Sequence, residues 1–287
     1  VTGLLFAAII WLSMAPLRHD GFDDSATRAL TPRERVFAEA EGFEEVAAII
    51  PGRCSMCHAR APYFEGIHHA PKNVLLETEA DYIQLSNLAS EYHVPDIGVR
   101  GAKAGLAKGI VATDAAYPVV TYPLLKEPQV ERSLMLALSR QESEMNPSAI
   151  SYVGARGLMQ FMPSTASREA RMSGLPYRQS WLTDDPGYNM TLGGQHLDYL
   201  LNRFNGSYIM TAAAYNAGPT RPSQWIADYG DPRTGQVDPI DWVEFIPFSE
   251  TRNYVQRILE NTQVYRSRLS GKPEEIRIQE DLERGKE

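Results

Sequence analysis

The chain has 287 residues, which is enough for one large domain or two smaller ones, each with a core of its own. Hydrophobic residues make up 43% of it and charged residues 22%, a balance that is typical of globular proteins. The net charge of -8 argues against a nucleic-acid partner, because no broad basic surface would neutralise phosphates. The two cysteines, Cys54 and Cys57, belong to one short motif, which excludes a framework of disulfides.

Residues 1–17 form an apolar segment without a charged side chain. The segment is shorter than the roughly 20 residues of a membrane-spanning helix. No basic stretch precedes it, as a signal peptide would require. We interpret it as a truncated membrane helix, and the apolar part of a signal peptide and a buried helix are the alternatives.

The motif Cys54-Ser55-Met56-Cys57-His58 lies in the next segment, residues 18–86. Two thiols three residues apart can bond to both vinyl groups of a haem, and the adjacent histidine can ligate its iron. Cys54, Cys57 and His58 are therefore predicted to bind haem c, with His58 on the iron. A redox dithiol and half of a zinc site remain open, although neither has the surrounding pattern that it needs.

This motif and the residues after it, including Gly66-Ile67 and Ala70-Pro71, resemble the cytochrome c domain at the C-terminus of membrane-bound urate oxidases. The resemblance covers about residues 1–85 and implies a small helical haem region behind a membrane helix. We expect this cytochrome c-like region to be incomplete, because no Met-Pro-Pro-type segment follows to supply the second axial ligand. The residues that could substitute for that ligand are His68, His69 and His93.

Residues 87–125 predict a helical connector, in which glycines punctuate a weakly helical stretch and Pro118 and Pro123 end it. The composition changes near residue 86. This change indicates two unrelated pieces, joined by natural fusion or during assembly of the gene.

An amphipathic helix is predicted from Glu127 onwards, because apolar residues recur at every fourth position up to Leu138. Glu142 extends that row, so its carboxyl is expected at the rim of the buried face. Pro147 ends the helix. The period does not choose between Glu142 and Glu144, and a glutamate on a helix is ordinarily only solvated.

Several separated motifs follow in the chain: Asn146-Pro147, Gly154-Ala155-x-Gly157-Leu158-Met159-Gln160, Asp185-Pro186-x-x-Asn189, Ala213-Ala214-Tyr215-Asn216-Ala217-Gly218-Pro219 and Glu250-Thr251-Arg252-x-Tyr254. Together they resemble the soluble lytic transglycosylases, whose catalytic domain is similar to goose-type lysozyme. The resemblance implies a mainly α protein with a lysozyme-like, all-helical catalytic domain at residues 126–270. Residues 271–287 alternate in charge, and we expect a disordered tail there.

The resemblance implies cleavage of the β-1,4 bond between N-acetylmuramic acid and N-acetylglucosamine in peptidoglycan. Such cleavage needs an acid to protonate the leaving oxygen, and a carboxyl at the edge of an apolar row has a raised pKa. Glu142 is implied to be that acid and then the base towards the C6 hydroxyl, which closes a 1,6-anhydro ring without a protein nucleophile or a cofactor. Lysozyme-type hydrolysis and a fused haem electron carrier are the alternatives.

The same resemblance implies a set of substrate-binding residues around this acid. Ser143 can hydrogen-bond beside the acid, although a serine at a helix end is as often a local cap. An apolar wall is expected from a methionine that could equally be core. The aromatic and acidic residues of the last motif are expected to line the cleft, with a surface ion pair and a core tyrosine as the alternatives. The full set is Ser143, Met159, Gln160, Tyr215, Asn216, Glu250 and Tyr254.

The implied partner is therefore a peptidoglycan glycan strand, and the implied location is the periplasm. Segment 1–17 would add contact with the inner membrane if it is a membrane helix. Haem attachment agrees with this location, because c-type haem and peptidoglycan both belong outside the cytoplasmic membrane.

Overall fold

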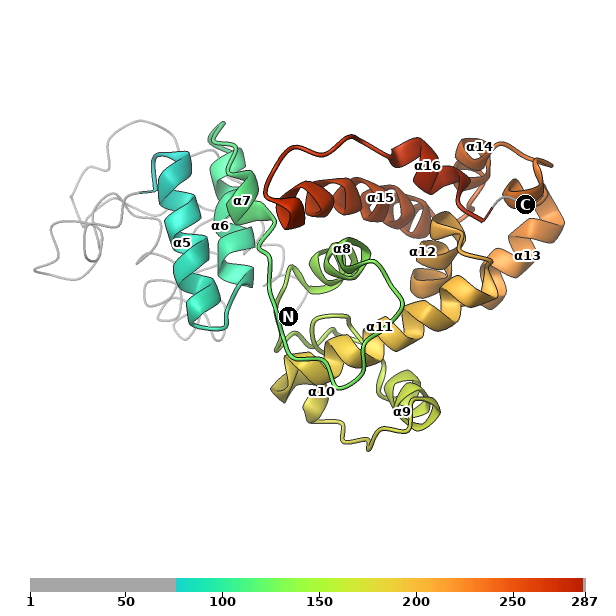
Figure 1. The fold of residues 1–287 in the computed structure, drawn as a ribbon, viewed down its shortest axis with the longest axis horizontal. Helices are drawn as coiled ribbons and strands as arrows, with labels where there is room; N and C mark the ends of the chain where they lie inside the picture. The colour runs from blue at the N-terminus through green and yellow to red at the C-terminus, as the bar shows by residue number, and fades with distance from the viewer. Residues whose placement is uncertain (1–75, 286–287) are drawn as a thin grey trace, which may run out of the picture. The chain divides into compact units, whose positions relative to one another are not determined.

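The computed structural model describes residues 76–285, which lie in one compact unit (Figure 1). Apart from isolated β-bridges, these residues form no strand, so the mainly α class is confirmed for them. The elements are α5 (Glu79–Glu91), α6 (Asp96–Leu106), α7 (Thr113–Ala116), α8 (Arg132–Ser143), α9 (Pro163–Met172), α10 (Trp181–Asp184), α11 (Pro186–Arg203), α12 (Tyr208–Ala217), α13 (Thr220–Tyr229), η3 (Pro232–Thr234), α14 (Pro239–Glu244), α15 (Ser249–Ser270) and α16 (Ile278–Glu283).

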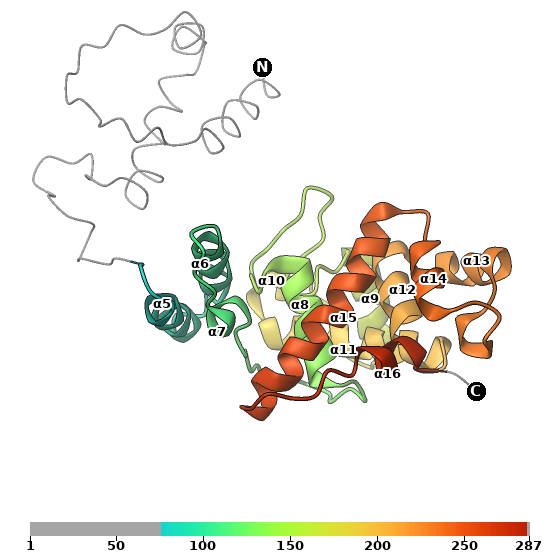
Figure 2. The ribbon, with the colours of Figure 1, turned by 90° about the horizontal axis from the view of Figure 1, so that it is seen from above.

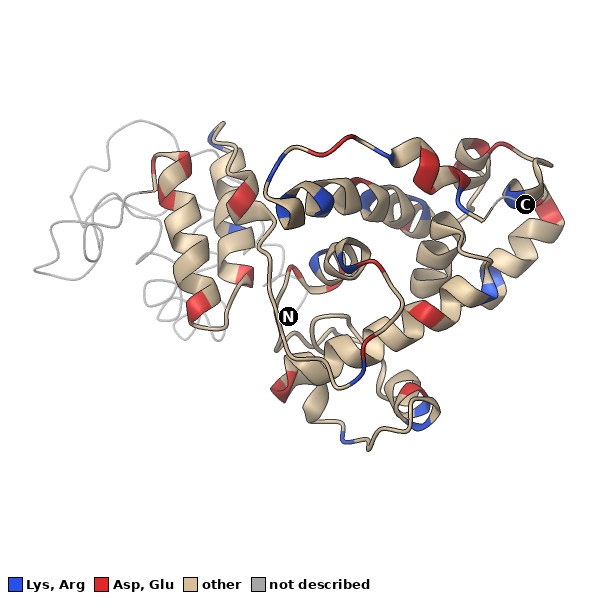
Figure 3. Cartoon of the chain, viewed as in Figure 1, with Lys and Arg blue, Asp and Glu red and all other residues tan. Residues whose placement is uncertain are grey.

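The predicted haem residues Cys54, Cys57 and His58 and the apolar segment 1–17 lie outside the described residues. Within residues 76–285, none of the helices is long and apolar enough to cross a membrane. Acidic and basic residues are interspersed over the described helices (Figure 3).

Helices α5, α6 and α7 pack around a small core of their own, whose buried members include Tyr82 and Ala102. The glycines of α6 lie against α5. A Cβ added at Gly98 would lie 2.4 Å from the Ser86 hydroxyl oxygen, and one at Gly105 would lie 2.9 Å from the Tyr82 ring. These glycines therefore let two helices approach closely instead of loosening a connector. Helix α5 is continuous across residue 86, near which the composition changes. The predicted domain boundaries stay predictions.

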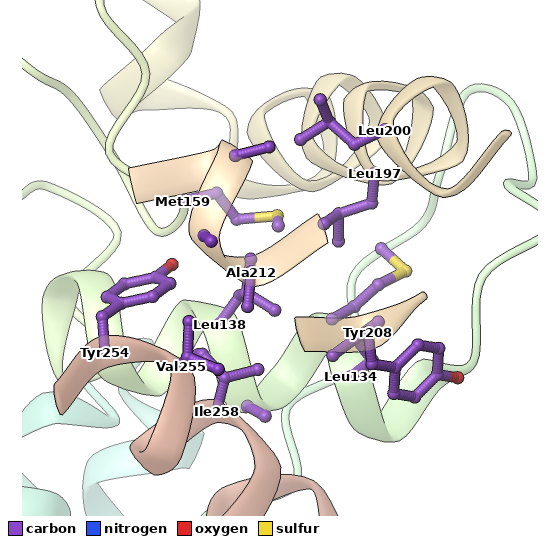
Figure 4. Packing of buried hydrophobic residues seen from close by; sticks show 14 of the residues in the cluster. Leu134, Leu138, Met159, Leu197, Leu200, Tyr208, Ala212, Tyr254, Val255 and Ile258 are labelled. Atoms are coloured by element: carbon purple, nitrogen blue, oxygen red, sulfur yellow. The ribbon is translucent and has the colours of Figure 1, made fainter. Parts of the chain in front are cut away.

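Helix α8 runs through the middle of the larger core, and α15 lies against it in both views of the ribbon (Figures 1 and 2). Leu134 and Leu138 are buried, as the four-residue period predicts, but residues 135–137 between them are buried too, so α8 is covered on all sides here. These residues share one core with α11, α12 and α15 (Figure 4). The helix ends at Ser143, before Pro147. The next two residues, Glu144 and Met145, have left-handed backbone angles of 54° and 68° in φ.

The prediction of a disordered tail is wrong for residues 271–285, because α16 folds back onto α12 and α15. An ion pair holds it there. Arg266 on α15, whose side chain is 4% exposed, donates to Asp281 on α16, whose side chain is 1% exposed. The same guanidinium donates to Glu131, just before α8, and this pairing lowers the pKa of Glu131 to about 2 in spite of its burial.

Candidate active site

Glu142 lies in the last turn of α8, at the rim of the core. Loss of hydration raises the pKa of its carboxyl to about 7, because burial disfavours the charged form. The Tyr254 hydroxyl on α15 opposes this shift by donating to Oε1 at 2.6 Å, and the negative charge of Glu250 reinforces it. Glu142 therefore holds a proton in part of the molecules at neutral pH, as a general acid must.

The structure distinguishes Glu142 from Glu144, which the helical period does not. Glu144 has a left-handed backbone, so its side chain leaves the core face and turns towards α6. Its carboxylate pairs there with Lys103, and Arg100 lies 3.7 Å away. Of these two glutamates, only Glu142 lies beside the hydroxyl of Tyr254.

A tight turn at residues 157–160 lies directly beside the end of α8. Ser143 donates to the Leu158 carbonyl oxygen at 2.8 Å, which fastens the turn to the helix. Gln160, with a left-handed φ of 48°, donates its amide to the carbonyl oxygens of Gly157 and Ala149 at 2.8 and 3.3 Å. Ser143 and Gln160 are thus brought to the Glu142 region, where both stabilise the turn.

Asn189, on α11, is a residue of this site that the sequence analysis did not assign. It is fully buried, accepts from the Met159 backbone N–H at 2.9 Å, and donates to two carbonyl oxygens. Gly157 makes room for it, because a Cβ there would lie 2.2 Å from the Asn189 amide nitrogen and the backbone φ is 76°. The signal was present, since Asn189 is part of the quoted Asp-Pro-x-x-Asn motif.

Tyr215 on α12 makes another contact with the turn. Its hydroxyl donates to the Met159 carbonyl oxygen at 2.7 Å. Burial holds the pKa of the Tyr215 and Tyr254 phenols well above 10, and the Glu142 charge adds to this, so both stay neutral donors. The Met159 side chain is fully buried beside Gly193 and belongs to the core (Figure 4), which does not agree with an apolar wall facing a sugar.

Thr251, the residue directly after Glu250, links this part of α15 to Asn216. The Thr251 hydroxyl donates to the Asn216 side-chain oxygen at 2.6 Å, which joins the end of α12 to the start of α15. Glu250 itself is exposed. Thr251 is a second residue that the sequence analysis quoted in a motif without assigning it a role. In the described part of the chain no cluster of three or more His, Cys, Asp or Glu residues could hold a metal ion.

Comparison with known proteins places this site in a described domain. Residues 124–236 match the family described as Transglycosylase SLT domain, and residues 245–274 match the one described as Soluble lytic transglycosylase helical domain. The soluble lytic murein transglycosylase of Escherichia coli K12 is 34% identical over 202 residues, which are 69% of this chain and 30% of that protein.

Two solved structures are similar as well. The 70-kDa soluble lytic transglycosylase SLT70 of Escherichia coli has a TM-score of 0.61 at 30% identity, over 75% of this chain and 34% of that one. An inactive Glu-to-Gln mutant of the Pseudomonas aeruginosa lytic transglycosylase Slt has a TM-score of 0.52 at 27% identity, over 85% and 38% of the two chains. The chain thus spans about a third of the length of these relatives. Glu142 lies within residues 124–236, the stretch that matches the family described as Transglycosylase SLT domain.

Proposed function

We propose that the chain is a lytic transglycosylase that cleaves the β-1,4 bond between N-acetylmuramic acid and N-acetylglucosamine in peptidoglycan and leaves a 1,6-anhydromuramoyl end. The observation that carries the proposal is a single carboxyl, Glu142, with a pKa of about 7 and a tyrosine hydroxyl on one of its oxygens. The similarity to proteins named as soluble lytic murein transglycosylases supports the substrate and the reaction.

The arrangement divides the work between the two oxygens of Glu142. Oε1 accepts from Tyr254, so the other oxygen carries the proton to the leaving oxygen of N-acetylglucosamine, and the bond from that oxygen to the anomeric carbon breaks. Tyr254 then stabilises the carboxylate. The carboxylate takes the proton from the C6 hydroxyl of N-acetylmuramic acid, whose oxygen bonds to the anomeric carbon. Glu142 ends protonated again, and no water is consumed.

The substrate contacts form the finer part of this proposal. The amide nitrogen of Gln160 is held by two carbonyl oxygens, so its Oε1 is oriented to accept from an acetamido N–H. The side chains of Asn216 and the exposed Glu250 supply further contacts to the glycan. The turn at residues 157–160 carries the contribution of Ser143, Met159 and Tyr215. The hydroxyls of Ser143 and Tyr215 donate to its backbone, and Met159 is part of it. Glu142 acts on the reacting atoms, and Tyr254 acts through its hydrogen bond to the Glu142 carboxyl.

Digestion of purified peptidoglycan and mass analysis of the released muropeptides test the proposal. Anhydro ends are expected, whereas reducing ends would assign the chain to the lysozyme-type hydrolases. Glu142→Gln should lower the turnover at least ~100-fold, the usual effect of removing a general acid. Glu144→Gln is the matched control, because it removes the partly exposed neighbour of the same type and should leave turnover within about twofold.

A second proposal concerns the motif Cys54-Ser55-Met56-Cys57-His58, whose spacing favours covalent haem c with His58 as one axial ligand. Haem c and a peptidoglycan substrate both fit a periplasmic location, and segment 1–17 would supply contact with the inner membrane. A visible spectrum of the protein expressed in the periplasm tests the haem proposal, because a protein without a Soret band carries no haem.

A further inference from the structure

A buried pair of ionisable side chains lies behind the site and has no part in the reaction above. Glu169 on α9 and His196 on α11 have side chains that are 2% and 8% exposed, and Glu169 Oε1 lies 3.2 Å from His196 Nδ1, without the alignment of a hydrogen bond. Arg168 donates to the same Oε1 from the surface at 3.1 Å. A buried carboxylate needs partners, so the position of His196 is tied to that of Glu169.

The imidazole of His196 packs against the ring of Tyr215, so the position of one ring restricts the other. The two rings lie 5.5 Å apart, at an angle of 58°. Phe161 contacts both rings edge-on, 5.9 Å from His196 and 6.3 Å from Tyr215. Tyr199 stacks on His196, at 6.1 Å and 22°. The imidazole is therefore packed among aromatic rings, one of which is the ring of Tyr215.

Tyr215 in its turn holds the backbone of residues 157–160 beside Glu142. Its hydroxyl donates to the Met159 carbonyl oxygen, and its phenol lies close enough to both Glu142 and Glu169 for each charge to raise its pKa. A displaced Tyr215 ring would remove the contact that holds the turn at the Met159 carbonyl, and it would admit water behind Glu142.

We propose that His196, held by Glu169, is a positioning residue of the transglycosylase reaction: it fixes the ring of Tyr215, and through it the Met159 carbonyl, beside Glu142. This inference rests on the proposed function. His196 is too deeply buried to contact a glycan, so its effect falls on turnover and leaves substrate affinity unchanged.

The test compares four variants by their kcat and KM on soluble peptidoglycan fragments. His196→Phe keeps a ring but leaves the Glu169 carboxylate without its inner partner, and kcat should fall about 10-fold with KM within about twofold, since small misplacements near a site carry effects of this order. The double variant Glu169→Leu/His196→Phe has no buried charge left, since Arg168 reaches the solvent, and it should regain most of the loss. Arg168→Gln, the control, removes the outer partner alone and should stay within about twofold of the wild type.

If His196→Phe does not fold, Glu169→Gln, which keeps the shape of the carboxyl, replaces it; the expected result is again a lower kcat at unchanged KM. A wild-type kcat for the variant that folds, or a loss in the double variant as large as in the single one, overturns the inference. In either case anhydro products from the wild type leave the proposed function intact.

A second measurement does not depend on activity. A carbon NMR titration of labelled glutamate side chains follows Glu142, which Glu142→Gln identifies by its missing signal. Glu142 should titrate near pH 7 in the wild type and at lower pH in His196→Phe, because water enters behind Tyr215. An unchanged titration overturns the inference even if the wild type forms no anhydro product and the proposed function fails.

Discussion

Replacing Glu142 by glutamine is expected to stabilise the folded protein at pH 8, although it removes the proposed acid. The pKa of this carboxyl is raised from its ordinary 4.5 to about 7, so ionising it in the folded protein requires about 2.5 times 1.36, or about 3 kcal/mol, more than in the unfolded chain. Below pH 4.5 the folded and the unfolded protein both hold the proton, so burial of this carboxyl costs no free energy of unfolding. The wild type loses this stability as the pH rises from 4.5 through 7, whereas the glutamine variant does not.

Urea unfolding of the wild type and of Glu142→Gln at pH 4, 6 and 8 measures the difference. The variant should gain about 3 kcal/mol on the wild type between pH 4 and pH 8, with most of the gain between pH 5 and 7. Glu144→Gln, which removes a partly exposed carboxylate paired with Lys103, should show no such gain. A difference between Glu142→Gln and the wild type that stays constant with pH would refute the burial argument for the acid.

Further substitutions examine the supporting contacts. Tyr254→Phe removes the hydrogen bond that favours the Glu142 carboxylate, so its pKa should rise further and the alkaline limb of the pH–activity profile should move to higher pH, at a kcat about 10-fold lower. Asn189→Ala leaves buried backbone groups of the turn without partners and should lower the free energy of unfolding by about 3 kcal/mol, as urea titration would show. Gly193→Ala places a Cβ 1.9 Å from the Met159 sulfur and should lower the melting temperature, with a loss of about 2 kcal/mol; an unchanged melting temperature would mean that Met159 moves freely.

The helix that carries the acid could be predicted from the sequence, but the choice between its two glutamates could not. Apolar residues at every fourth position mark the buried face of α8, and Glu142 continues that row. The left-handed backbone at Glu144 and Met145 turns the second glutamate away, and neither residue is a glycine or asparagine that would have marked such a conformation. The left-handed conformation of these two residues is determined only by the packed fold.

Other parts of the site depend on contacts between residues that are distant in the sequence. Glu169 and His196 read as an ordinary helical glutamate and a lone histidine, and only the packing of α9 against α11 brings them together. Met159 lies in a motif that indicates a substrate contact, yet its side chain fills the space beside Gly193. The sequence alone does not show which side of a tight turn faces the core.

The return of α16 onto the core has a practical consequence for anyone who moves this domain into another protein. The family matches end at residue 274, before Asp281. A fragment cut there keeps Arg266 buried with Glu131 but without its second anion, and it strips the cover from part of α12 and α15. The unit that can be transplanted intact is therefore longer than the stretch that the family models match, and a fusion junction belongs after residue 285.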